Sequence, residues 1–334
     1  MGETNGTIET IPLSEGRLSA NVLTMGASLM DLVLDMPEGP RPVILSLGNP
    51  QAYRINPHYL GVIAGRCANR IRGGDCVIDG RSHQLDRNEN GRTHLHGGST
   101  GFSRKLWQVA ARTATSVTLA LQSPDGDQGY PGTVTATCLY ELVPGNRLRI
   151  TLTAKTDATT LVNLAAHAYF NLAPGSSILD HALMMPAQRY TPVDVSLIPD
   201  GRLLPVSDTG YDFTTPVRIG AQREKTAAGF DHNFVLANAP RPEPALAARL
   251  ISPQRDLTLE IWSTEPGLQF YDGAKLDGGP GAPHPELPAF AGCCLEPQRF
   301  PDAIHHPHFA SALLKAGETY RQVTEYRFLA PGVA

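Results

Sequence analysis

The stretch TVTATCLYELVPGNRLRITLTAK, residues 133–155, indicates the fold class most clearly. Apolar side chains occupy every second position from 134 to 142 and again from 148 to 154, with mostly polar residues between them. A period of two sends alternate side chains to opposite faces of a strand, so each half predicts a half-buried β-strand. Pro144, Gly145 and Asn146 between the halves are typical turn residues. Residues 133–155 therefore predict an antiparallel hairpin.

Similar alternation recurs at residues 116–122 and 257–261, whereas helical periodicity is scarce. The chain contains 32 glycines and 28 prolines, which interrupt it too often for long helices. A short patch at residues 245–250 suggests one or two helical turns. We therefore predict an all-β fold and, within that class, a large antiparallel β-sandwich.

The length of 334 residues would suffice for two average domains, but β-sandwiches are often this long as one domain. Two proline-rich segments, residues 238–244 and 277–288, are too short to separate domains, and strand patterns lie on both sides of them. We therefore expect residues 1–334 to form a single domain. The sequence does not set the oligomeric state, so a monomer and a homodimer both remain open.

The composition is that of a globular protein, with 41% hydrophobic and 18% charged residues. A net charge of −4, without any basic run, gives no reason to expect nucleic acid or an anionic membrane as a partner. No apolar stretch reaches the ~18 residues that a transmembrane helix needs. The polar N-terminus lacks the pattern of a signal peptide. Five cysteines without C-x-x-C spacing argue against a disulfide framework and a zinc knuckle, so we expect a cytoplasmic protein.

Two titratable residues each follow an apolar segment. Glu296 follows residues 289–295, which we interpret as a buried strand that ends at this carboxylate, and His167 follows the apolar residues 160–166. Burying a carboxylate costs several kcal/mol unless the group is paired or used. Glu296 is therefore either a salt-bridged structural acid or a catalytic one, and the pattern alone favours a core role for His167. Together the two residues suggest acid–base chemistry.

Further polar clusters allow both a functional and a structural interpretation. Arg66, Arg70 and Arg72 alternate in what we interpret as an extended segment, so they should point to one side, as oxygen-binding donors or as a solvated basic face. His94 and His96 form an H-x-H pair, but no third metal ligand follows, so we expect no metal site.

Three other segments carry candidates of the same kind. Asp231 precedes an apolar strand and would ordinarily cap a turn, and Gln269 lies between apolar neighbours. The histidines at 305, 306 and 308 indicate a surface loop rather than a metal site, because Pro307 interrupts them. The chain has no P-loop, dinucleotide fingerprint, nucleophile elbow or H-E-x-x-H motif.

Taken together and in order, these clusters resemble the aldose 1-epimerase family. The matching segments lie between residues 61 and 309, and their joint occurrence is far more specific than any one of them. They are GRCANRIRGG (65–74), NGRTHLHGG (90–98), GFSRKLW (101–107), SPDGDQGYPG (123–132), HAYFNL (167–172), FDHNF (230–234), PGLQFYDG (266–273) and CLEPQRFPDAIHHPHF (294–309).

The resemblance implies a β-sandwich of the galactose-mutarotase type that interconverts the α and β anomers of a free monosaccharide. By the family pattern Glu296 is the general base, His167 is the general acid and His96 is a neighbouring histidine at the reducing end of the sugar. The residues that would bind sugar hydroxyls are Arg70, Asp231, Gln269 and Asn69. This acid–base chemistry requires no metal, nucleotide or other cofactor. Trp107, Tyr169 or Phe270 could stack on the sugar.

The chain departs from the family pattern at Ala274-Lys275-Leu276 and at Ile304-His305, which leaves the preferred sugar open. One alternative is a related epimerase that acts on a sugar phosphate, a pentose or another sugar carbon. A phosphate site would need additional cations at the cleft mouth, for which Arg66, Arg72, Arg92 and Arg104 are candidates. A second alternative is a sugar-binding domain without activity, which would have no use for a buried acid–base pair.

Overall fold

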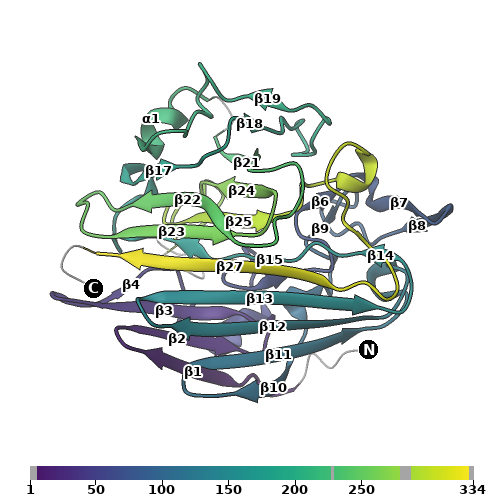
Figure 1. Cartoon of the computed structure of the whole chain (residues 1–334), viewed down its shortest axis with the longest axis horizontal. Helices are drawn as coiled ribbons and strands as arrows, with labels where there is room; N and C mark the ends of the chain where they lie inside the picture. Colours follow the sequence, from purple (N-terminus) through teal and green to yellow (C-terminus); the bar gives the residue numbers. More distant parts are fainter. Residues whose placement is uncertain (1–5, 227–228, 279–286, 331–334) are drawn as a thin grey trace.

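The computed structural model describes residues 6–226, 229–278 and 287–330 (Figure 1). Within these residues the strands of every sheet run antiparallel to their neighbours, and the one α-helix is the short α1 (Ile219–Arg223). Short 3₁₀ helices span Pro50–Arg54, Arg72–Gly74, Phe102–Arg104, Asp127–Gly129, Ile178–Asp180 and Ala303–His305. The prediction of an all-β antiparallel fold is confirmed.

A nine-stranded sheet forms one side of the molecule (Figure 1). In spatial order it contains β10 (Gln108–Arg112), β11 (Ser116–Ser123), β12 (Val134–Val143), β13 (Arg147–Thr156), β27 (Tyr320–Leu329), β23 (Thr258–Ser263), β22 (Ala245–Ile251), β17 (Ala182–Met184) and β20 (Val217–Arg218). The predicted hairpin is β12–β13, in which Val143 pairs with Arg147 across the turn. Residues 245–250 form strand β22 and not helical turns, because their backbone pairs with β23 on one side and β17 on the other.

Two further sheets pack against this one. The six-stranded sheet contains, in order, β16 (Tyr169–Phe170), β25 (Cys293–Gln298), β24 (Gly267–Tyr271), β21 (Asp231–Val235), β18 (Arg189–Tyr190) and β19 (Leu204–Pro205). The four-stranded sheet contains β1 (Thr10–Glu15), β2 (Leu18–Leu23), β3 (Leu29–Met36) and β4 (Gly39–Pro42). Short pairs are β5 (Ile63–Ala64) with β15 (Ala165–Ala166), β6 (Arg70–Ile71) with β9 (His94–Leu95), β7 (Asp75–Ile78) with β8 (Arg81–Gln84), and β14 (Thr160–Leu161) with β26 (Leu313–Leu314).

The main hydrophobic core lies between the sheets. Phe170 of β16 packs edge-on against Tyr326 of β27 with ring centroids 5.0 Å apart, which joins the six-stranded sheet to the nine-stranded one. Burying a large apolar side chain stabilises the fold by about 1.5–3 kcal/mol. The core therefore holds β16 and β25, which carry part of the polar cluster described below, against a rigid scaffold.

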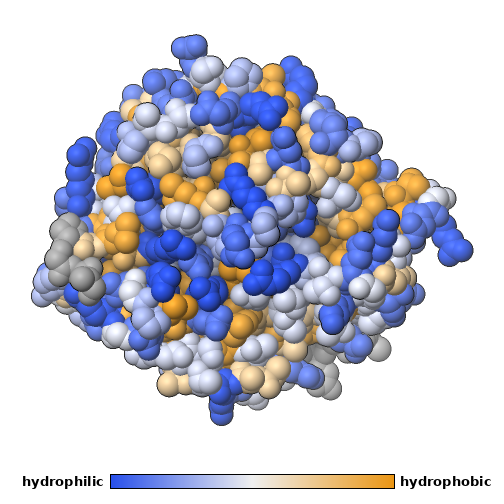
Figure 2. All heavy atoms as spheres, viewed as in Figure 1, coloured by the Kyte–Doolittle hydropathy of each residue, from blue (hydrophilic) through white to orange (hydrophobic). Residues whose placement is uncertain are grey.

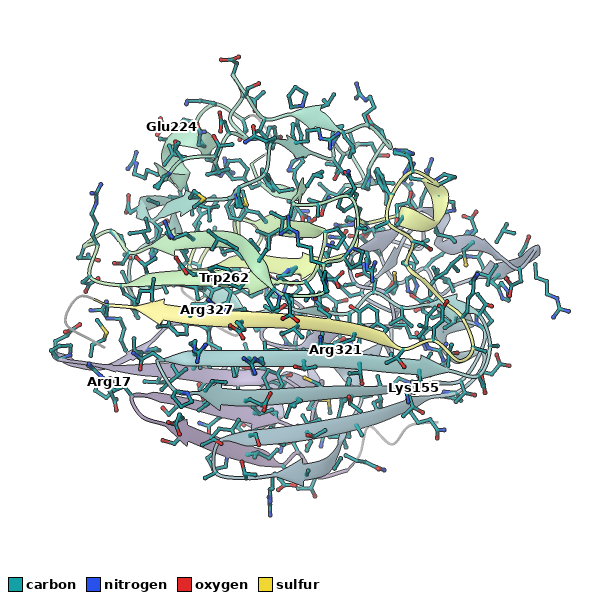
Figure 3. The ribbon with its side chains drawn as sticks, in the orientation of Figure 1. Arg17, Lys155, Glu224, Trp262, Arg321 and Arg327 are labelled. Carbon is teal, nitrogen blue, oxygen red and sulfur yellow. The ribbon has the colours of Figure 1, made fainter. Side chains whose placement is uncertain are left out.

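The outer face of the nine-stranded sheet is polar and partly exposed. Hydrophilic and hydrophobic residues intermix on the face seen in Figure 2. In Figure 3 Trp262 on β23 and Arg327 on β27 lie side by side, and the Arg327 guanidinium lies 4.2 Å from the centre of the Trp262 ring. Among the described residues no helix has the length and apolar character needed to cross a membrane. Of the proline-rich segments, residues 279–286 lie outside the described residues.

Candidate active site

The six-stranded sheet aligns the polar residues of three adjacent strands. Gln269 of β24 pairs with Glu296 of β25, and Asp231 of β21 pairs with Tyr271 of β24. Side chains two residues apart on a strand share a face, so Cys294 and Glu296 point to the same side. Their neighbours Cys293 and Leu295, by contrast, belong to the main hydrophobic core. Glu296 lies inside the strand, not at the end of a strand over residues 289–295 as the sequence suggested, because β25 begins at Cys293 and continues past Glu296 to Gln298.

A pocket of about 140 Å³ lies over this face. It is lined by Pro57, His58, Tyr59, Asn69, Arg70, Leu95, His96, His167, Tyr169, Asp231, Tyr271, Lys275 and Glu296. Six of the seven predicted site residues are in this lining. The seventh, Gln269, lies beside them and donates a hydrogen bond from Nε2 to Asp231 Oδ1 at 2.7 Å. The structure therefore brings together the whole predicted set.

Glu296 and His167 form a buried pair in this pocket. Their exposed fractions are 2% and 5%, and His167 Nε2 lies 3.8 Å from Glu296 Oε1. The second carboxylate oxygen, Oε2, is buried and has no hydrogen-bond partner. A buried polar atom without a partner costs about 1–3 kcal/mol. This orphaned acceptor marks the carboxylate as a group available to a ligand.

Burial controls the protonation of both groups. It raises the pKa of Glu296 well above its usual 4.5, with Asp231 adding to the rise and Arg70 opposing it. It lowers the pKa of His167 to about 4, although the backbone carbonyl of His167 and the charge of Asp231 favour the protonated ring. Between these two pKa values the pair thus holds one proton, which resides on Glu296. A hydroxyl that donates to Glu296 would stabilise the carboxylate and favour transfer of this proton to His167.

Arg70 is fixed by two acidic residues. Its Nε and Nη2 each donate to Glu89 at 2.8 Å, and its Nη1 lies 3.6 Å from Asp231. Burial alone would lower the pKa of Arg70, but the hydrogen bond to Glu89 and the nearby carboxylates raise it, so the guanidinium stays charged. Glu89 was not predicted as a site residue. No pattern marked it, because only the fold brings it to the arginine.

His96 reaches the pocket through an unusual backbone conformation. Its φ of 49° departs from an extended strand, and its Nδ1 accepts a hydrogen bond from the Asn69 backbone N–H at 3.2 Å. Burial, together with His167 and Arg70, lowers the pKa of His96 well below 6.5. The neutral ring therefore carries its proton on Nε2, where it can donate to a ligand.

The predicted alignment of the three arginines is wrong. Arg66 is buried and donates to Ser123 and to nearby backbone carbonyls, and Arg72 pairs with Asp302, so neither lies beside Arg70. The reason is that residues 65–74 are not one extended segment: β6 contains only two residues, and a 3₁₀ turn follows it.

His94 does not face the ligand pocket with His96. It bonds the Asp86 carbonyl through Nδ1 and the Tyr130 hydroxyl through Nε2. Among the described residues, the one group close enough to share a metal ion is His167, Cys294 and Glu296, whose ligand atoms lie within 4.8 Å of one another.

The prediction of aromatic residues that could stack on a sugar is only partly correct. Trp107 and Phe270 belong to the core, whereas Tyr169 lines the pocket. Tyr59 and Tyr271 also line the pocket. Tyr271 lies in one of the segments that carry the family resemblance, whereas no sequence signal identified Tyr59. The φ of Tyr59 is 58°, a backbone conformation that depends on the surrounding fold.

Comparisons with known proteins identify the family of the chain. The family model described as aldose 1-epimerase matches residues 9–327. Galactose mutarotase of Bos taurus is 37% identical over 328 residues, which cover 97% of this chain and 94% of that protein. Aldose 1-epimerase of Escherichia coli (strain K12) is 34% identical over 318 residues, 92% of this chain and 91% of the other.

Solved structures show the same similarity. The crystal structure of an aldose epimerase homologue from C. elegans superposes with a TM-score of 0.89 at 26% identity, covering 97% of this chain and 99% of that chain. Galactose 1-epimerase from Lactobacillus acidophilus NCFM gives a TM-score of 0.82 at 27% identity, again covering 97% and 99% of the two chains.

Proposed function

The chain belongs to the aldose 1-epimerase family and is an aldose mutarotase, an isomerase, and on that premise we propose that Glu296 and His167 exchange the protons of its reaction. The observation that carries this proposal is their buried contact at 3.8 Å in the wall of the pocket. Such a pair can act at once as base and acid on one small ligand.

The chemistry of anomer exchange fits a pair that holds one proton. Glu296 takes the proton of the anomeric hydroxyl while His167 gives a proton to the ring oxygen. The bond between the anomeric carbon and the ring oxygen then breaks, and a carbonyl forms at that carbon. Rotation about the adjacent carbon–carbon bond presents the other carbonyl face. Reclosure reverses both proton transfers, so the pair ends with the proton distribution that it had at the start.

The remaining polar residues suit the binding of a polyol. Arg70 and His96 supply donors, Asp231 supplies an acceptor, and Asn69 and Gln269 lie next to them. Gln269 keeps a buried Oε1 without a partner, so it retains an acceptor. Tyr59 and Tyr271 offer aromatic surface for the apolar face of a sugar ring.

We further propose that the substrate is a neutral aldose such as galactose or glucose, taken up in the cytoplasm. The names of the relatives support galactose, and the five buried free cysteines suit a reducing compartment. Of the four arginines considered for a phosphate, none lines the pocket, although all four are described. The observation that favours a charged substrate is exposed Lys275 at the pocket.

The test is polarimetry on freshly dissolved α-D-galactose and α-D-glucose at pH 7. The protein should speed the approach to the rotation that each sugar reaches without it. Comparison with exchange of the anomers of glucose 6-phosphate, followed by NMR, separates the neutral from the charged substrate. Faster turnover of the phosphate would overturn the proposed neutral substrate, and no acceleration with any aldose would overturn the proposed roles of Glu296 and His167.

A further inference from the structure

Cys294 contacts the nitrogen of His167 that faces away from Glu296. Its Sγ lies 3.6 Å from His167 Nδ1, and both side chains are buried. The other ring nitrogen, Nε2, faces Glu296 at 3.8 Å. The imidazole is therefore held between a thiol and a carboxyl group that come from the same strand, two residues apart. The adjacent Cys293, by contrast, packs in the main hydrophobic core.

Tyr169 and Glu296 flank the same imidazole. The Tyr169 ring packs against it with ring centroids 5.3 Å apart, and the Tyr169 hydroxyl donates to the backbone carbonyl of His58 at 3.0 Å. Nε2 must be unprotonated to receive a proton from Glu296, so the proton of the neutral ring belongs on Nδ1, where the sulfur of Cys294 can accept it.

These contacts favour one tautomer of the neutral imidazole. We propose that Cys294 is a positioning residue that holds the Nδ1–H of His167, so that Nε2 alone gains and loses the proton of catalysis. The inference rests on the proposed function of His167.

A thiol suits this place because it orients the ring without fixing its charge. Burial raises the pKa of Cys294 well above 9.0, so the sulfur stays neutral. A carboxylate at Nδ1 would stabilise the imidazolium and keep the proton on His167. The other groups near the ring are the backbone carbonyl of His167 and the side chains of Glu296, His96, His58, Tyr59, Tyr169 and Asp231. With the weak partner, the proton can move between Glu296 and His167.

The adjacent Cys293 provides a matched control. Both cysteines are fully buried on β25, but Cys293 faces the main core, where its backbone pairs with Phe170. If Cys294 only fills space, alanine at either position should lower stability and leave turnover intact. If it positions His167, Cys294→Ala should lower kcat about 10- to 100-fold with little change in KM, as loss of an orienting partner does. Cys293→Ala should leave kcat unchanged.

Two further measurements separate positioning from packing. The ¹⁵N shifts of selectively labelled histidine report the tautomer of each ring, and at neutral pH His167 should carry its proton on Nδ1. Cys294→Ser should recover part of the lost kcat, since a hydroxyl also accepts a hydrogen bond.

The outcomes distinguish this inference from the proposed function. The inference fails if His167 carries its proton on Nε2 in the unaltered protein, or if Cys294→Ala and Cys293→Ala give the same kcat as the unaltered protein. His167→Asn is the reference in both cases. If it keeps full activity, the proposed role of His167 fails as well; if it is inactive, the proposed function stands without the role of Cys294.

Discussion

The nine-stranded and six-stranded sheets differ in which of their side chains are buried. Along β12 buried and less buried residues alternate, whereas every residue of β25 is buried. Among the described residues, one member of the nine-stranded sheet, Tyr326, has a buried side-chain atom without a hydrogen-bond partner. The six-stranded sheet has four such residues: Asn233, Gln269, Glu296 and Gln298. Unpartnered buried polar groups are unfavourable for stability. They gather in the sheet that lines the pocket, so the nine-stranded sheet stabilises the fold and the six-stranded sheet holds the polar groups needed for chemistry.

The largest expected effect comes from removing the carboxylate. Glu296→Gln should lower kcat by about 10²–10⁴-fold, because it deletes one acid–base group. The free energy of unfolding should change little or rise, because the variant no longer buries a titratable carboxyl group. Polarimetry and urea denaturation together measure both quantities. A variant with normal turnover would remove Glu296 from the mechanism.

A core substitution in the other sheet should show the reverse behaviour. Leu259 on β23 is fully buried, so Leu259→Ala should lower the free energy of unfolding by about 2–5 kcal/mol. Turnover of the folded fraction should stay unchanged, because the residue does not line the pocket. Chemical denaturation and polarimetry at a temperature where the variant is folded measure the two effects. A tenfold loss of kcat in the folded variant would show that the nine-stranded sheet affects catalysis as well as stability.

The pH dependence of kcat/KM should follow the protonation of Glu296 and His167. Below the His167 pKa of about 4 both groups carry protons, no base remains, and kcat/KM should fall about tenfold per pH unit. Above the raised pKa of Glu296 the pair has lost its last proton, and kcat/KM should fall again. The profile should therefore be flat through mildly acidic pH. A fall centred near the ordinary histidine pKa of 6.5 would contradict the burial of His167.

The lowered pKa values of buried histidines also make the free energy of unfolding depend on pH. His167, His181 and His232 each have a pKa lowered by burial to about 4, so the unfolded chain takes up protons first as pH falls from 6.5. Their contribution to stability is present above pH 6.5 and is lost as pH falls toward 4. Circular dichroism at each pH is the control that separates this loss from the catalytic profile.

The smallest expected effect is on the outer face of the nine-stranded sheet. Arg149 on β13 donates to Glu325 on β27 at 2.8 Å, and the arginine side chain is 38% exposed. Arg149→Ala should lower the free energy of unfolding by only about 0.2–1 kcal/mol and leave kcat unchanged. Denaturation at low and high salt measures this effect. A loss of several kcal/mol would mean that polar pairs, and not only the core, stabilise this sheet.

The contrast between the sheets also explains what the sequence could predict. The β12–β13 hairpin was visible because one face of each strand is only partly buried, so apolar and polar residues alternate. That signal is absent along β25, where both faces are buried, and its start was placed four residues early. The residue pattern singled out Glu296 and His167 as candidate acid–base groups, whereas the roles of all seven site residues were predicted from a family resemblance. Contacts such as Arg70 with Glu89, or Cys294 with His167, depend on distant segments that meet only in the fold.

The central claim is that Glu296 and His167 act as one unit. Polarimetry on Glu296→Gln, His167→Asn and the double variant, each shown to be folded, tests it most directly. Groups that act together show strongly non-additive losses. The double variant should be no more than slightly slower than the slower single variant. If the kcat loss of the double variant instead equals the product of the two single losses, the groups act independently, which would contradict the shared-proton mechanism.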